Sequence, residues 1–95
     1  MQMLDEQIKL VDKATEDFHS LQRRVLQAEI EFEFSWQALR VANMSSARSL
    51  AIAYQKAGIR LVRLETDLKV ALANLREKQG DFSAAAHQLA LASEK

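Results

Sequence analysis

The sequence predicts an all-α protein, a long antiparallel coiled-coil helical hairpin with a short C-terminal helix, which we expect to complete a helical bundle by oligomerisation. The 95 residues include no proline and two glycines, and helix-favouring residues run along the whole chain. Apolar residues recur at alternating spacings of three and four in two long segments, the heptad pattern of helices that pack along a shared seam. A cluster of helix-capping residues, Asn43-Met44-Ser45-Ser46, separates the two segments.

The first helix is predicted to cover about residues 4–42. Its heptads place large apolar residues at every a position and mostly small residues at the d positions. The a residues are Leu4, Val11, Phe18, Val25, Phe32 and Leu39, and the d residues are Gln7, Ala14, Leu21, Ala28, Ser35 and Ala42. This stripe gives the helix one face that must be buried against a partner.

After a turn at residues 43–46, the second helix is predicted to cover about residues 46–79. Its seam residues are Ala47, Leu50, Tyr54, Ala57, Leu61, Leu64, Leu68, Ala71 and Leu75. Because their three-four alternation has no break at Gly58, we place this glycine inside the helix, where it costs up to about 1 kcal/mol relative to alanine.

Two helices of similar length joined by a short turn pack antiparallel. The turn at residues 43–46 then sets a register in which large seam residues face small ones, so that the two helices fill the space between them. The expected pairs are Phe18 with Ala71, Phe32 with Ala57, Leu61 with Ala28, and Leu75 with Ala14. The same register places Glu31 beside Arg60. It also places Arg24 beside Asp67.

A second turn is predicted at residues 80–81, because Gly80 suits the position after a helix end and Asp81 suits an N-cap. A short third helix would then cover about residues 82–93, with Phe82 and Leu89 on its apolar face. The length of the chain supports one modest core, so we expect residues 1–95 to form a single helical domain.

Several large apolar residues remain outside the predicted seam, near the hairpin tip. Trp36 is expected beside Ala51 and Gly58, where it would form the aromatic wall of a shallow groove that another helix could fill. Others occupy outer helix positions that are polar in an isolated hairpin. The predicted partner-binding residues are Trp36, Leu26, Val62, Phe34, Ile30, Ile52, Ile59 and Val41.

Charge is distributed unevenly, although thirteen basic residues balance thirteen acidic ones. Residues 1–33 carry eight acids and four bases, a net charge of −4, and residues 64–95 carry five acids and four bases, a net charge of −1. Residues 34–63 carry no acid and five bases. These bases, the predicted basic tip, are Arg40, Arg48, Lys56, Arg60 and Arg63. The tip is therefore both basic and apolar.

These features predict a non-enzymatic protein-interaction or scaffold module. A homo-oligomer, most simply a dimer, is expected because one chain cannot cover its own tip; the alternative is a small dedicated chaperone or adaptor, for example of the secretion type, that shields a client helix. Binding of nucleic acid or of an anionic membrane through the basic tip is a lesser alternative. Glu29, Glu31 and Glu33 lie level with tip bases, and the apolar residues do not leave one wide polar face.

The sequence shows few residues that could form a catalytic or metal-binding site. It has no cysteine, which excludes disulfides and thiolate sites. Glu16 and His19 have the Glu-x-x-His spacing of di-iron bundles but fall on the outer face without a second motif. No nucleophile–base pair or phosphate-binding glycine loop is evident. We expect no enzyme activity, no cofactor and no metal, and a cytoplasmic location, since no signal peptide or membrane-spanning run is evident.

Overall fold

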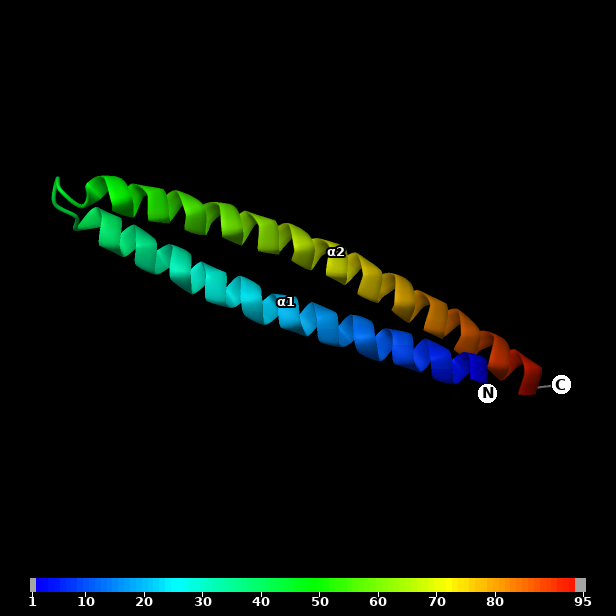
Figure 1. Cartoon of the computed structure of the whole chain (residues 1–95). Coiled ribbons are helices and arrows are strands. Elements are labelled where there is room, and N and C mark those ends of the chain that lie inside the picture. Colours follow the sequence, from blue (N-terminus) through cyan, green and yellow to red (C-terminus); the bar gives the residue numbers. More distant parts are fainter. Residues whose placement is uncertain (1, 94–95) are drawn as a thin grey trace. The chain divides into compact units, whose positions relative to one another are not determined.

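The computed structural model describes residues 2–93, which form two long α-helices and no strand. Helix α1 spans Gln2–Arg40 and helix α2 spans Ala47–Ser93, and a short turn joins them (Figure 1). The predicted all-α class and the long helical hairpin are confirmed.

Helix α1 ends two residues earlier than predicted. Its first turn carries Asp5 and its last turn carries Arg40, charges that complement the helix dipole at each end. Beyond Arg40, the backbone N–H of Ala42 donates to the carbonyl of Leu39 at 3.2 Å, which closes one tight turn after the helix. Val41 therefore lies in the connection and not on the helix.

Asn43 organises the turn and the start of α2. Its side-chain Oδ1 accepts a hydrogen bond from the backbone N–H of Ser46 at 3.1 Å and others from the hydroxyls of Ser45 and Ser46. Its backbone carbonyl accepts from the N–H of Ala47 at 3.0 Å. Asn43 thus satisfies N–H groups that the first turn of a helix leaves without partners. The predicted turn at residues 43–46 is confirmed.

Helix α2 is continuous through Gly80 and Asp81, so the predicted turn at residues 80–81 and the separate helix at 82–93 are wrong. Gly80 does not adopt a positive φ, the conformation that would mark a glycine helix end. Beyond Leu75, the three-four spacing continues without a phase break. The partly buried residues that continue it are Lys78, Phe82 and Ala85. Their packing offsets the small helix penalty of glycine.

The chain divides into two compact units. The hairpin unit is Leu21–Leu68 and contains the turn. The terminal unit combines Met1–Ser20 with Lys69–Lys95. Each unit contains part of α1 and part of α2, and each has its own buried seam residues.

The core of the hairpin unit is a single line of seam side chains. Val25, Ala28 and Leu64 are buried, and Ala28 is only 2% exposed. Further seam residues, partly buried, pack against these three: Leu21, Leu61 and Leu68. Leu61 thus packs in the cluster that contains Ala28, as the large-with-small register predicts. All six residues were expected on the seam, which confirms the heptad pattern here.

In the terminal unit, Ala14 and Leu75 are buried, and both belong to the predicted seam. Gln7 also occupies a seam position, but its side-chain Oε1 is buried without a hydrogen-bond partner. A buried polar atom of this kind lowers stability, because its hydration is lost and not replaced.

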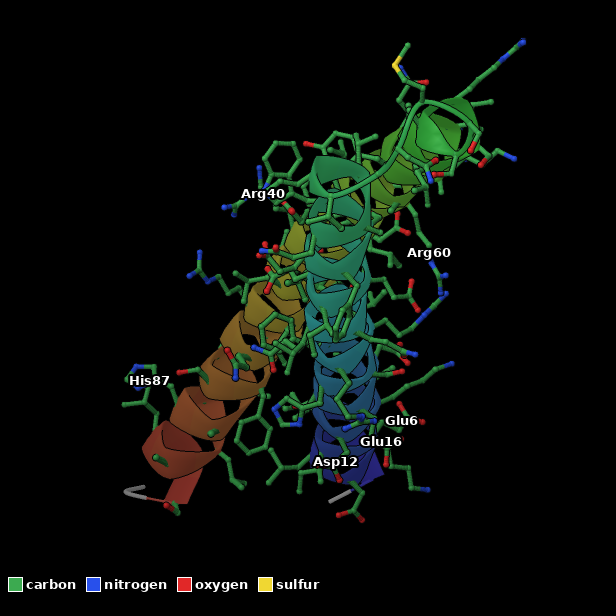
Figure 2. All side chains as sticks on the ribbon, turned by 90° about the vertical axis from the view of Figure 1, so that its left-hand side faces the viewer. Glu6, Asp12, Glu16, Arg40, Arg60 and His87 are labelled. Atoms are coloured by element: carbon green, nitrogen blue, oxygen red, sulfur yellow. The ribbon has the colours of Figure 1, made fainter. Side chains whose placement is uncertain are left out.

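One cross-helix ion pair confirms the register of the hairpin unit. Arg60 of α2 donates from Nη1 to Oε2 of Glu31 of α1 at 3.2 Å; Arg60 is labelled in Figure 2. The other expected pair, Arg24 with Asp67, does not form an ion pair in the described part of the chain. Both side chains are exposed, where water competes for each charge.

Candidate protein-binding surface

All eight predicted partner-binding residues lie in the hairpin unit and are exposed. Their exposed fractions range from 44% for Trp36 and Ile52 to 81% for Val41. They project outward because the seam positions of both helices are already occupied by the residues of the core. Exposed large apolar side chains therefore outnumber the three buried residues of the same unit.

A groove lies along α2 in the hairpin unit, with a volume of about 910 Å³. We call it the Gly58 groove. Phe32 of α1 contributes to its lining, and the other lining residues come from α2: Tyr54, Gln55, Gly58, Ile59, Leu61, Val62 and Arg63. The groove brings together Gly58, which was expected to line a groove, and two of the predicted partner-binding residues, the exposed Ile59 and Val62.

The aromatic wall of this groove differs from the predicted one. Phe32 and Tyr54 form it, with ring centroids 4.7 Å apart and planes inclined by 24°. Trp36 lies against Tyr54 instead, at 5.8 Å and 48°, and does not line the groove. The antiparallel register explains the correction: Gly58 lies level with Phe32, whereas Trp36 lies one helical turn nearer the tip, level with Tyr54.

Gly58 allows Phe32 to occupy this position. A Cβ atom on Gly58 would lie 3.1 Å from Cε2 of the Phe32 ring, tighter than an ordinary van der Waals contact. The glycine therefore serves close approach between the helices, and the ring closes the inner side of the groove. The predicted register already pairs Phe32 with Ala57, the neighbour of Gly58, so the sequence contains the signal for this contact. The prediction that Trp36 forms the aromatic wall is wrong.

A second depression lies on α1 of the same unit, with a volume of about 420 Å³. We call its apolar residues, spaced by four, the α1 stripe: Leu26, Ile30 and Phe34. Glu29 and Glu33 flank the stripe, and Oε1 of Glu33 accepts a hydrogen bond from Nε2 of Gln37 at 3.1 Å. The α1 stripe is thus apolar with an acidic margin.

All five bases of the predicted basic tip belong to the hairpin unit and are exposed. A third depression, of about 580 Å³, is lined mainly by basic side chains and by Ile59 and Leu64; its basic residues are Arg24, Lys56, Arg60 and Arg63. Arg60 is paired with Glu31, and Arg40 and Arg60 project toward opposite sides of this unit in Figure 2. The tip bases therefore do not form one continuous basic face.

Within residues 2–93, no three His, Asp or Glu side chains are grouped so that they could hold a metal ion. Glu16 and His19, the candidate pair of the sequence, are both exposed on α1.

Neither helix, over its described residues, contains a segment apolar and long enough to cross a membrane.

The chain was compared with known proteins at the level of family, sequence and fold. No protein-family pattern matches it, no curated protein matches its sequence, and no solved structure matches its fold.

Proposed function

We propose that this chain is a non-enzymatic protein-interaction or scaffold module that presents the hairpin unit to a partner helix or to a second copy of itself. The observation that carries the proposal is the balance between exposed and buried apolar groups. In the hairpin unit, all eight predicted partner-binding side chains are at least 44% exposed, whereas three seam residues are buried. Covering such a surface contributes about 25 cal/mol per Å² of apolar area removed from water.

The form of the surface favours a helical partner. Gln55, Gly58 and Val62 follow one another along α2 at spacings of three and four residues, and Ile59 lies next to Gly58, so the Gly58 groove runs along the helix axis. A groove of this kind accepts an amphipathic helix, whose anchoring residues recur at the same spacing.

A second candidate function is that of a small dedicated chaperone or adaptor. The Gly58 groove favours it, because a volume of about 910 Å³ and a mostly apolar lining suit an amphipathic client helix. In this role the free chain would have its groove open and would cover it only in complex with the client.

Binding to nucleic acid or to an anionic membrane through the basic tip is supported less well. Arg60 is engaged by Glu31, and Arg40 and Arg60 project to opposite sides of the unit (Figure 2). A phosphate backbone or a bilayer surface would therefore meet only part of the basic set at one time.

The test combines molar mass in solution, measured by light scattering over a wide concentration range, with uptake of a hydrophobic dye by the same samples. Association, or strong dye uptake by a monomer, supports the proposal, whereas a monomer that takes up no dye contradicts it.

Val62 and Val70 give a matched pair of variants for this experiment. Both lie on α2, with exposed fractions of 63% and 65%, but only Val62 lines the Gly58 groove. Val62→Ser is expected to weaken association or dye uptake, and Val70→Ser is expected to leave both unchanged. Equal effects of the two substitutions would contradict a role for the groove.

A further inference from the structure

We propose that the occupant of the Gly58 groove is a second copy of this chain, with the α1 stripe of each copy lying in the groove of the other. This inference rests on the proposed function and names the partner that the surface fits. The groove and the stripe both lie in the hairpin unit, and they match in dimensions and in charge.

The stripe and the groove match in length and periodicity. Leu26 to Phe34 spans two turns of α1, about 12 Å at 1.5 Å per residue. Gln55 to Val62, along the groove, spans about 10 Å of α2 by the same measure. The side chains of the stripe are at least half exposed, so they are free to enter a groove on another molecule.

The charges at the margins of the two surfaces are opposite. Glu29 and Glu33 line the depression that holds the α1 stripe. Arg63 lines the Gly58 groove, and Lys56 lies beside Ile59 in the adjoining depression. Among residues 2–93, none of these four charges takes part in an ion pair within its own chain. They are therefore available to a partner, where opposite charges select the partner and fix its register.

Both complementary surfaces belong to one chain, which is the condition for reciprocal association. In a twofold dimer, a contact from one copy to the other is necessarily repeated in the opposite direction, so each stripe would fill a groove and neither surface would remain open. An unrelated helix could satisfy one groove, but it would leave the α1 stripe of this chain uncovered. The second copy accounts for both surfaces at once.

The experiment reverses the charges on each side separately. One variant carries Glu29→Lys and Glu33→Lys, the other carries Lys56→Glu and Arg63→Glu, and a fourfold variant carries all four changes. We expect the wild-type chain to form a particle of twice the 10.8 kDa chain mass. Each double variant alone is expected to dissociate with a dissociation constant raised roughly 100-fold, because like charges then face one another.

The decisive samples are the equimolar mixture of the two double variants and the fourfold variant. In the mixture, each reversed stripe meets a reversed groove, so heterodimers are expected; the fourfold variant is expected to form homodimers. The matched control is the double variant Asp12→Lys with Glu16→Lys, which makes the same charge change four residues apart on exposed positions of α1, in the terminal unit. It should remain dimeric.

Helicity measured by circular dichroism separates lost association from lost folding. If a charge reversal lowers the helix content, the milder pair Glu29→Gln and Glu33→Gln replaces it and should still weaken the dimer. Dimers that persist in both double variants, or a mixture that fails to associate, would overturn the proposed pairing. A monomeric wild-type chain that takes up dye would also overturn it and point to a different protein as the partner. A monomer without dye uptake would contradict the proposed function as well.

Discussion

The ring of Phe32 occupies the space that a side chain at residue 58 would need. A Cβ atom on Gly58 would lie 3.1 Å from Cε2 of Phe32, and the ring in turn stacks on Tyr54 at 4.7 Å. Gly80, on the same helix, has no atom within 4 Å of the corresponding position. The two glycines of α2 are therefore present in very different surroundings, although both are helical.

The two glycines should respond differently to alanine. Gly80→Ala is expected to raise the free energy of unfolding by up to about 1 kcal/mol, because alanine favours helix and nothing obstructs its methyl group. Gly58→Ala should raise the free energy of unfolding by less, since the Phe32 ring must shift to admit the methyl group. Urea denaturation of both variants measures the difference. A destabilised Gly80→Ala would indicate a helix break at residue 80, contrary to the continuous α2.

Ala28 should not tolerate a larger residue. It is 2% exposed and packs in the core with Val25 and Leu64, so Ala28→Leu is expected to lower the free energy of unfolding by about 1–3 kcal/mol. Ala53→Leu, at an exposed position of α2, is the control and should have little effect. Equal stability of the two variants in urea denaturation would mean that the seam does not pass through Ala28.

Replacing Gln7 with leucine should stabilise the terminal unit. The Oε1 atom of Gln7 is buried without a hydrogen-bond partner, and leucine removes that polar atom while keeping a side chain of similar size. The free energy of unfolding is expected to rise by about 1–2 kcal/mol, measured by thermal and urea denaturation. A loss of stability in Gln7→Leu would show that the amide is hydrogen-bonded in solution.

The ion pair between Arg60 and Glu31 should contribute little to stability, despite its value as a marker of register. Both side chains remain substantially exposed, at 59% and 43%, so water and salt screen the attraction. A double-mutant cycle with Arg60→Gln and Glu31→Gln is expected to give a coupling energy below about 1 kcal/mol that falls as salt is added. Zero coupling at low salt would mean that the pair is not formed in solution.

Much of the fold follows from the spacing of seam residues and from the Asn43 cap, both of which are local properties of the sequence. The error at Gly80 has an identifiable cause. The spacing that keeps Gly58 inside α2 also continues past Gly80, through Lys78 and Phe82, which are partly buried. A count of apolar residues alone misses Lys78, because lysine is charged. Its methylene stem can nevertheless pack on the seam while its ammonium group reaches water, so the heptad pattern continues through it.

The residues of the candidate surface could be predicted from the sequence only in part. The outward positions of Leu26, Ile30 and Val62 follow from helix periodicity alone, and their exposure agrees with it. The aromatic wall depends on which side chains meet across the helices, and a difference of one turn separates Trp36 from Phe32. Periodicity gives the face of a residue, but the direction of each side chain on that face is set by packing.

The Asn43 cap has a kinetic consequence for how the chain folds. It fixes the turn at the point where residues of the two helices are nearest in sequence, so closing the hairpin there costs the least loop entropy. Contacts between the two helices should then form first beside the turn and later toward the chain ends. Asn43→Ala is accordingly expected to slow refolding, whereas Ala14→Gly, far from the turn, should mainly accelerate unfolding. Stopped-flow measurements of both rates would show whether the two helices join in that order.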